Sequence, residues 1–595
     1  MKEFINTVMT SDAVAYLMLT IRMFTPLIAL WVVWRCYTSF RKGLRRRDPL
    51  IMLRNLETEE TYPILYWENS IGRSRSCDIV LDDPRVSRDH AVLYRREEGW
   101  FIADTGSRSG TFLGEGEEAE KIEDSSLVGL GETIRVGATY LSLEKTELSP
   151  EKRKFFRGFR RTAASPFSLL FLTTLVHGSM ALQLCLGTGK IDLMPLAPFI
   201  CLFVLSWVFY FISMKLLHRV SFELETVGLL LSGVGIMLLS GADIEGVKTQ
   251  MIATILGISI FMFLIWFMGN ADRVEKFRIV FALGAIGLFA ANMVLGTEIN
   301  GSKNWIYIGS FSFQPSELIK IAFVLVGASA LHRLQTRKNI TEFIIFGAVC
   351  LGFLFIMRDF GTACIFFAGF LVIAFMRSGS IRTIALILAV AVLGVIMILY
   401  FKPYVAQRFA GWMHVWEHTQ DSLGFQQTRA LTYIASGGLF GMGLGNGYLK
   451  YIAAGDSDLV FAMLSEEQGL FMSLTVLAAI AMLILYVRSD VTRSRSTVYS
   501  ITSCAAAGIL VFQMCLNVFG TTDVLPLTGV TLPFISSGGS SMMSVWGMLA
   551  FIKASDERTY AVRRASRRQQ KQMEEEARRA QFEDIYSGKF TEERK

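Results

Sequence analysis

The 595-residue chain is predicted to be a polytopic α-helical membrane protein with an all-β domain inserted near its N-terminus. Three observations predict this fold class. Residues are 52% hydrophobic and the mean hydropathy is +0.42, which is too apolar for a soluble chain of this length. Apolar stretches close to the ~20 residues that cross a bilayer recur between residues 165 and 552. A polar stretch at 50–148 separates them from an earlier apolar segment.

The charge and the cysteines exclude other classes. The net charge is +7, but the basic residues cluster beside apolar segments, as the positive-inside rule expects, so nucleic acid is not a predicted partner. The eight cysteines are scattered and form no CxxC pair. We therefore predict neither a disulfide framework nor a zinc site.

Residues 1–49 are predicted to form a transmembrane anchor and a basic linker. The segment 13–36 is mostly apolar and is interrupted by Arg22, and five Lys and Arg residues follow between positions 41 and 47. These charges place the end of the segment in the cytoplasm and the N-terminus outside. Arg22 is expected to face a neighbouring helix or to snorkel, with a role in a relay as the alternative.

Residues 50–148 are predicted to form an all-β sandwich on the cytoplasmic side. Short runs such as AVLYRR and TIRVGATYLSLE alternate between apolar and polar residues, and Gly, Asp and Ser turns separate them. Period-two alternation with turn signals every ~10 residues is typical of strands in a sandwich.

Three motifs in this stretch occur in one order: IGRSRSCDIVLDD, RVSRDHAVL and DTGSRSGTFL. They resemble the GR, SxxH and SxNGT signatures of the forkhead-associated (FHA) domain. The resemblance implies phosphothreonine-peptide binding by Arg73, Ser87 and Arg88, and a guanidinium fork with a hydroxyl suits a phosphate. His90 is expected to be structural. Ser109 replaces the family's usual Asn, so a docking module that needs no phosphate is the alternative.

Residues 149–221 are predicted to be a basic linker followed by a transmembrane hairpin, and 557–595 a charged cytoplasmic tail. The hairpin segments lie near 165–187 and 192–215, and ten more follow within 222–556. These ten are expected near 224–241, 249–268, 279–296, 316–334, 342–357, 360–376, 381–400, 462–486, 497–520 and 539–554. With the first segment they make thirteen, so a chain that starts outside ends inside, in agreement with its basic tail.

The part at 222–556 carries five motifs in one order: GSKNWIYIGSFSFQPSELIKI, RDFGTA, GFQQTRALTYIASGGLFGMGLGNG, DSDLVFAMLSEEQGL and LPLTGVTLPFISSGGSS. They resemble the SEDS (shape, elongation, division and sporulation) family of bacteria, of the RodA/FtsW kind, over about 330 residues. The resemblance implies a ten-helix core, here with about three extra helices, in the bacterial cytoplasmic membrane. Two positions depart from the family. Arg358 replaces a proline, and Asn304 replaces an arginine whose role Lys303 could supply.

The resemblance also implies an activity. The family polymerises glycan strands of peptidoglycan from lipid II, releases undecaprenyl diphosphate, and works with a class B penicillin-binding protein. Such a transfer needs a base for the incoming sugar hydroxyl and a positive charge for the departing diphosphate, and a divalent cation (Mg or Mn) could supply the charge. A lipid-precursor flippase and an inactive scaffold for a phosphorylated partner are the alternatives.

Asp458 matches the family's essential aspartate and is predicted to be the catalytic base at the outer membrane surface. A helix N-cap formed by Ser457 or Asp458 is the structural alternative. Glu466 and Glu467 follow within the next helix; one is expected to be structural, and a helper role for the other stays open.

Five further residues are predicted to bind substrate. Glu317 and Lys320 are spaced i, i+3 in an apolar segment, so they share a helix face and are expected to line a cavity. A buried pair that only fixes helix packing is the alternative. Arg429 and Lys402 are candidates for diphosphate contacts, and Gln426 accompanies Arg429.

Two motifs resemble other sites. GMGLGNG at 441–447 has the glycines of a phosphate loop, but no strand precedes it and no GK[ST] follows, so we expect a flexible turn. HVWEH at 414–418 matches the HxxEH of a metallopeptidase, but the large soluble domain that would complete such a site is missing from the sequence pattern.

Overall fold

The computed structural model describes residues 12–43, 51–144, 164–329, 337–389, 392, 411–556 and 559. Within these ranges it leaves out 65–67, 75–76, 96–98, 115, 117–118, 123–124, 188–191, 218, 220, 300–301, 309–310, 379–380, 383, 422 and 492–496. Lys402, most of the predicted segment 381–400 and the tail beyond Thr559 therefore lie outside the described residues.

Eleven short strands form the sandwich near the N-terminus, in two sheets of order β2-β1-β11-β10-β7-β8 and β4-β3-β5-β6-β9. In β1 alternate residues face the space between the sheets: Ile51 and Leu53 are buried, and Leu53 pairs with Leu143 of β11. The strands are β1 (Ile51–Asn55), β2 (Thr61–Ile64), β3 (Glu68–Gly72), β4 (Ile79–Val80), β5 (Ala91–Arg95), β6 (Trp100–Asp104), β7 (Thr111–Leu113), β8 (Glu120–Lys121), β9 (Ser126–Val128), β10 (Thr133–Val136) and β11 (Thr139–Glu144).

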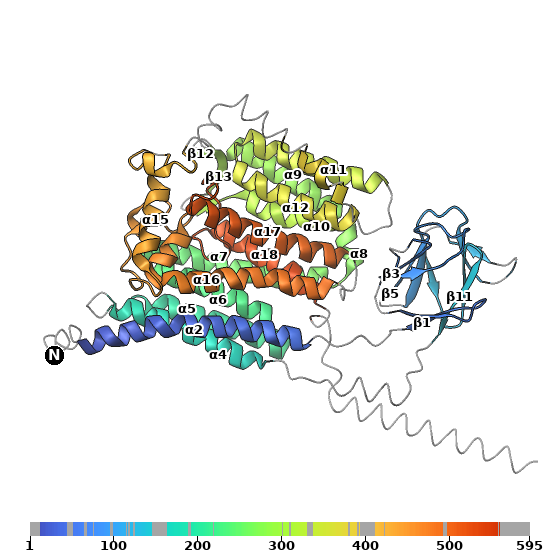
Figure 1. Cartoon of the computed structure of the whole chain (residues 1–595), viewed down its shortest axis with the longest axis horizontal. Coiled ribbons are helices and arrows are strands. Elements are labelled where there is room, and N and C mark those ends of the chain that lie inside the picture. The colour runs from blue at the N-terminus through green and yellow to red at the C-terminus, as the bar shows by residue number, and fades with distance from the viewer. Residues whose placement is uncertain are drawn as a thin grey trace, which may run out of the picture.

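A helical bundle forms most of the remaining described chain (Figure 1). Its helices are α2 (Asp12–Gly43), α4 (Pro166–Leu186), α5 (Leu196–Phe211) with the π-helical turn η2 (Ile212–Leu216), α6 (Glu223–Ser240), α7 (Ile244–Met268), α8 (Ala271–Lys276), α9 (Arg278–Leu295), α10 (Pro315–Ser329), α11 (Arg337–Ile356), α12 (Phe360–Ser378), α15 (Phe425–Gly437), α16 (Val460–Asp490), α17 (Thr497–Thr521) and α18 (Gly539–Ser555). Three strands, β12 (Thr297–Ile299), β13 (Ser302–Ile308) and β14 (Phe311–Phe313), connect α9 to α10.

Eight helices among the described residues are long and apolar enough to cross a membrane, which confirms the polytopic helical prediction. They are α2, α4, α5 with η2, α6, α7, α9, α16 and α17. Helices α10, α11, α12 and α18 occupy four further predicted segments. In α6 every residue is buried, so this helix lies inside the bundle rather than at its lipid-facing surface.

Helices α2, α4 and α5 lie along one side of the bundle, and α9, α11 and α12 lie on the opposite side (Figure 1). Helix α2 packs against α4, α6 and α16, so the anchor predicted from residues 13–36 is part of the bundle. Helix α15 crosses one end of the bundle, and the sandwich lies at the other end (Figure 1). There the backbone N–H of Thr497, at the start of α17, donates to the carboxylate of Glu68 in β3 at 2.9 Å.

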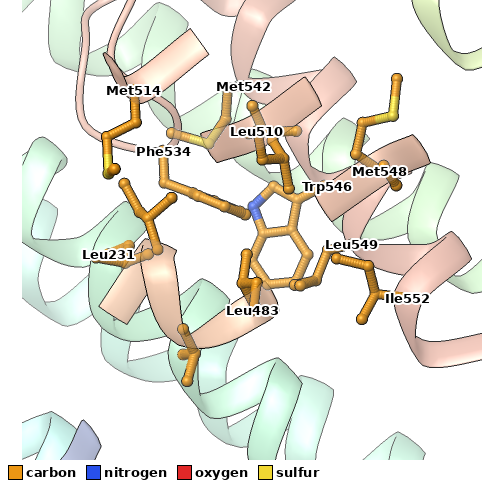
Figure 2. Close-up of a cluster of buried hydrophobic side chains, with 14 of the residues drawn as sticks. Leu231, Leu483, Leu510, Met514, Phe534, Met542, Trp546, Met548, Leu549 and Ile552 are labelled. Carbon is orange, nitrogen blue, oxygen red and sulfur yellow. The ribbon is translucent and has the colours of Figure 1, made fainter. Parts of the chain in front are cut away.

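The core of the bundle holds the loop before α18 in place (Figure 2). Trp546 of α18 is fully buried, and its indole N–H donates to the Ser232 hydroxyl of α6 at 3.2 Å. Phe534, from the preceding loop, packs edge-on against Trp546 with ring centroids 6.1 Å apart. Because edge-to-face aromatic contacts are directional, Phe534 helps to anchor this loop to the core.

Candidate functional site

A cavity of about 510 Å³ lies near the end of the bundle that carries α15 and β12–β14. Its lining comes mainly from residues 302–317, 358–365, 456–458 and 527–541, together with Gln426. The volume is within the ~300–1,000 Å³ that is usual for small-ligand sites. The charged side chains on its wall are four carboxylates and one guanidinium, namely Glu317, Asp359, Asp456, Asp458 and Arg358.

Asp458 lies on the cavity wall directly before α16. Its backbone is fixed, because its carbonyl oxygen accepts bonds from Asn517 Nδ2 at 2.8 Å and Thr521 Oγ1 at 3.3 Å, both on α17. No hydrogen bond from another described residue reaches its carboxylate. The helix N-cap is Leu459 and makes no side-chain cap bond, so the capping alternative is wrong. The Asp458 carboxylate is therefore held in position without being used by the fold.

The surroundings of Asp458 suit a base that works near neutral pH. Burial raises the pKa of Asp458 from 3.8 to about 6, and the negative charge of neighbouring Asp456 adds to this rise. A general base is most effective when its pKa is near the operating pH. Opposite it, a Cβ atom added to Gly529 would lie 3.4 Å from Asp458 Oδ2, so the glycine keeps the space beside the carboxylate open.

Asp359 is a second cavity carboxylate, and the sequence reasoning missed it. Its Oδ2 accepts bonds from Asn304 Nδ2 at 3.0 Å and Gln314 Nε2 at 3.2 Å, and its Oδ1 accepts one from the backbone N–H of Thr362 at 3.1 Å. The signal was present, since Asp359 precedes an apolar helix just as Asp458 does. Asn304, in the arginine's place, holds this carboxylate.

Glu317 and Lys320 form the predicted ion pair, 2.8 Å apart, with side-chain exposures of 7% and 2%. Only Glu317 lines the cavity. Lys320 lies behind it and donates to Gln513 Oε1 at 3.0 Å, and Gln513 in turn donates to the Thr531 hydroxyl at 3.0 Å. The geometry thus combines both readings, with a buried pair that orients one carboxylate into the cavity.

Of the other candidate substrate residues that the structure describes, Gln426 lines the cavity and Arg429 does not. Gln426 lines the cavity and donates to the Ala453 carbonyl at 3.0 Å. Arg429 lies one turn later on α15, outside the described cavity wall, with its guanidinium 5.3 Å from the Phe425 ring centroid. Lys303 donates to the Met293 carbonyl at 2.7 Å and is also not on that wall, so it does not replace the family's arginine there.

Glu466 and Glu467 both have structural partners. The Glu466 carboxylate accepts bonds from the backbone N–H groups of Tyr448 at 2.7 Å and Leu449 at 3.0 Å. The Glu467 carboxylate accepts one from Gly445 at 2.9 Å. Both side chains are completely buried and away from the cavity wall. They bind backbone groups at 445–449, at the end of GMGLGNG, so this run belongs to a bound loop rather than the flexible turn that we expected.

The HVWEH motif does not form a metal centre in the described part of the chain. His418 Nδ1 lies 3.4 Å from Asp421 Oδ2, and His414 Nδ1 lies 3.0 Å from the Trp412 carbonyl oxygen. No group of three or more His, Cys, Asp and Glu side chains that could hold an ion occurs among the described residues.

In the sandwich, three loops meet at one end and carry the predicted phosphate ligands. The backbone N–H of Arg73 donates to the Ser87 carbonyl at 3.0 Å, and that of Arg108 donates to the Ser87 hydroxyl at 3.1 Å. The side chains of Arg73, Arg88 and Arg108 are exposed. Three arginines, one from each of three motifs that are distant in sequence, thus make one cationic surface.

His90 and Ser109 brace these loops. His90 is buried, accepts a bond from the Ser87 N–H at its Nδ1 (3.0 Å), and therefore donates from Nε2 to the Gly110 carbonyl (3.1 Å). The Ser109 hydroxyl donates to the Arg85 carbonyl at 2.8 Å. His90 is structural, as predicted. The Ser109 side chain, which stands in for the usual Asn, is occupied within the fold.

Comparisons with known proteins match the same two regions. A model of the family described as cell cycle protein (FtsW, RodA and SpoVE) matches residues 214–559. A model of the FHA domain matches residues 69–137. The first of these covers more than half of the chain.

Individual relatives agree. The probable peptidoglycan glycosyltransferase FtsW of Tolumonas auensis is 30% identical over 340 residues, which are 54% of this chain and 88% of that protein. That of Coxiella burnetii is 32% identical over 260 residues, 42% of this chain and 70% of that one. The rod shape determining protein RodA of Thermus thermophilus has a solved structure that is 23% identical, with a TM-score of 0.42 over 56% of this chain and 95% of that one. The chain therefore belongs to the FtsW, RodA and SpoVE family over its C-terminal part and carries an FHA domain near its N-terminus.

Proposed function

We propose that the protein is a peptidoglycan glycosyltransferase that polymerises glycan strands from lipid II at the outer face of the bacterial cytoplasmic membrane. The observation that carries the proposal is Asp458, a positioned carboxylate on the cavity wall that no described residue hydrogen-bonds. The relatives of this chain that are named probable peptidoglycan glycosyltransferase FtsW support the substrate class.

In this mechanism Asp458 acts as a general base. It takes the proton from the acceptor sugar hydroxyl while that oxygen attacks the anomeric carbon of the donor. A new C–O bond forms and the bond from the same carbon to the diphosphate oxygen breaks, so undecaprenyl diphosphate leaves with the electron pair. Attack opposite the leaving group inverts the anomeric carbon. General-base catalysis of this kind typically contributes ~10²–10⁴ in rate.

The charge of the cavity supports a divalent cation (Mg or Mn). Four carboxylates and one guanidinium line the wall, which would repel a diphosphate without added positive charge. No three described acids lie close enough to hold an ion unaided. Mg²⁺ is often bound by one or two carboxylates together with substrate phosphates, so one wall carboxylate other than Asp458 would be enough, and Asp458 would stay free as the base. The bound ion would stabilise the charge of the leaving diphosphate.

Other residues would bind and orient the substrate. Gln426 and Glu317 can hydrogen-bond sugar hydroxyls from the cavity wall, with Lys320 fixing Glu317 from behind. Arg358 is the one guanidinium on the described wall and is proposed to contact the diphosphate. Arg429 and Lys402 are proposed to meet the diphosphate or the lipid outside this cavity.

The arrangement in the membrane follows from charge. Basic connections, such as the one that follows α16, belong in the cytoplasm by the positive-inside rule. The sandwich contacts α17 next to that connection, at the end of the bundle opposite α15 (Figure 1). We therefore propose that the FHA domain and the C-terminus are cytoplasmic and the cavity opens outward. A class B penicillin-binding protein would be the transpeptidase partner.

The test of the enzyme is polymerisation by the purified full-length protein in liposomes, with lipid II and Mg²⁺. Wild type should form glycan polymer, and Asp458→Asn should not. Polymer formed equally by both would contradict the assignment of Asp458. Translocation of labelled lipid II across the liposome, without polymer from wild type, would support the flippase alternative.

The FHA domain is proposed to bind a phosphothreonine protein through Arg73, Ser87 and Arg88. Hydrogen bonds between charged partners contribute about 1.5–3 kcal/mol, so Arg73→Ala should weaken binding of a phosphothreonine peptide by about 10–150-fold. Arg95→Ala, at the far end of β5, is the matched control and should change little. Isothermal calorimetry with phosphorylated and unphosphorylated peptide checks this. Equal binding of both peptides would favour the docking alternative.

A further inference from the structure

Helix α16 is broken at Gly469, one turn after the buried glutamates. Gly469 has φ +82°, which only glycine adopts readily. In an unbroken helix the N–H groups of Leu470 and Phe471 would donate to the carbonyls of Glu466 and Glu467. Here they donate to Gly438 at 2.9 Å and Leu439 at 3.2 Å. The freed helix carbonyls need other partners.

The segment 438–443 supplies those partners. The N–H groups of Met442 and Gly443 donate to the carbonyls of Glu466 and Glu467, each at 2.9 Å. The fit is so close that a Cβ atom on Gly441 would lie 2.2 Å from the Glu467 carbonyl oxygen. The loop thus replaces the main-chain hydrogen bonds of one helical turn; it does not merely pack against the surface of the helix.

The splice, meaning the insertion of segment 438–443 into the break of α16, lies at the end of the half-helix that follows Asp458. Only residues 459–468 connect Asp458 to the break. The carboxylates of Glu466 and Glu467 bind the same loop again at 445–449. Asp458 is thus held from two sides, by α17 at its carbonyl oxygen and by the loop at the far end of this short half-helix.

Two helices outside the family match hold the splice. Arg22 of α2 donates from Nη1 to the carbonyl oxygen of Gly441 at 2.9 Å. Gln468, the last residue before the break, donates to Gln183 Oε1 of α4 at 2.8 Å. Gln183 also donates to the Thr25 hydroxyl of α2 at 3.4 Å. The family match begins at residue 214, so these contacts belong to the N-terminal extension.

Helix α2 is itself fixed to the bundle at its other end. The Ser39 hydroxyl donates to Glu223 Oε1 of α6 at 2.8 Å, and the Phe40 ring stacks on Tyr486 of α16 with centroids 3.7 Å apart. Arg22 is therefore presented by a helix that cannot shift freely along the bundle. In a half-buried site its guanidinium is a strong donor to a carbonyl.

We propose that Arg22 is a positioning residue for the glycosyl transfer. Through Gly441 it holds the loop spliced into the break of α16, and the loop keeps the half-helix and Asp458 in register with the cavity. Gln183 supports the same point from α4. The N-terminal helices are thus part of the catalytic apparatus and not only an anchor for the FHA domain. This inference rests on the proposed transferase function.

The test compares wild type, Arg22→Met and Arg22→Lys, with Arg35→Met as control, as full-length proteins in lipid nanodiscs. Arg35 is on the same helix, and no hydrogen bond or ion pair joins its guanidinium to another described residue. Polymerisation of lipid II with Mg²⁺ gives kcat and KM, and hydrogen–deuterium exchange follows the peptides over 438–451. Thermal unfolding identifies any variant that does not fold.

Arg22→Met should lower kcat tenfold or more, change KM less than twofold, and speed exchange at 438–451. Arg22→Lys keeps a donor and should recover part of both effects, and it carries the test if Arg22→Met does not fold. Arg35→Met should match wild type. A wild-type kcat in Arg22→Met, unchanged exchange at 438–451, or the same losses in Arg35→Met would overturn the inference. If wild type forms no polymer, the proposed function fails, while the exchange data still decide whether Arg22 holds the break.

Discussion

Asp458 and the glutamate pair Glu466 and Glu467 lie within ten residues of one another, yet they occupy opposite kinds of site. Asp458 is on the wall of the cavity, and no described residue hydrogen-bonds its carboxylate. Glu466 and Glu467 are completely buried, and backbone N–H groups of residues 445–449 satisfy them. The difference teaches that an acid near a membrane surface is available for chemistry only when the fold does not use it.

The largest expected effect is on the rate of lipid II polymerisation, and it should distinguish Asp458 from the two glutamates. Asp458→Asn removes the base but no bond of the fold, so polymerisation should fall by ~10²–10⁴. The unfolding temperature at pH 7 should not fall. Initial rates with lipid II and circular-dichroism melting measure the two quantities. A lower melting temperature in Asp458→Asn than in wild type would mean that the Asp458 carboxylate has a structural partner.

The second effect should appear in stability. Glu466→Gln removes the charge that accepts the N–H bonds of Tyr448 and Leu449, and bonds to charged groups contribute about 1.5–3 kcal/mol. We expect a loss of the order of one such bond in the free energy of unfolding, with the rate per folded molecule reduced less than tenfold. Denaturant unfolding in detergent checks this. Unchanged stability would contradict the clamp that we describe.

The third and smallest effect concerns pH. The folded pKa of Asp458 is about 6, so the rate should decline about tenfold per pH unit below that value. Asp456→Asn removes the second cause of the raised pKa and should move the midpoint to lower pH, while burial keeps it above 3.8. pH–rate profiles of both proteins test this. A midpoint that rises in Asp456→Asn would have the wrong sign.

The raised pKa of Asp458 also determines whether stability rises or falls with pH. Between pH 3.8 and about 6 the folded state binds more protons at Asp458 than the unfolded state does. At this group stability therefore rises as the pH falls through that range. Asp458→Asn should remove this contribution, which differential melting of the two proteins can measure.

The sequence predicted the fold class well because the apolar segments and the alternating strands are local signals. The membrane helices and the sandwich, which begins at Ile51, could be read from periodicity and charge. The site was harder. Asp458 carried a motif, but nothing near Asp359 reveals that Asn304 and Gln314 lie opposite it, because the bonds join segments 45 to 55 residues apart.

The splice at Gly469 could not be predicted either. The run GGLFGMGLGNG indicated a flexible turn, because sequence shows glycine's freedom but not the partner that uses it. The close approach of Gly441 to Glu467 exists only once α15 and α16 pack together. The contact from Arg22 joins positions 419 residues apart, and the sequence offered only a charge within an apolar helix.

The central claim is that Asp458, and neither glutamate, carries the chemistry. The most direct measurement is the rate of lipid II polymerisation per folded molecule for Asp458→Asn and Glu466→Gln, prepared and assayed side by side. We predict that Asp458→Asn is at least tenfold slower than Glu466→Gln and that Glu466→Gln stays within tenfold of wild type. Equal losses in the two variants, or a faster Asp458→Asn, would contradict the account.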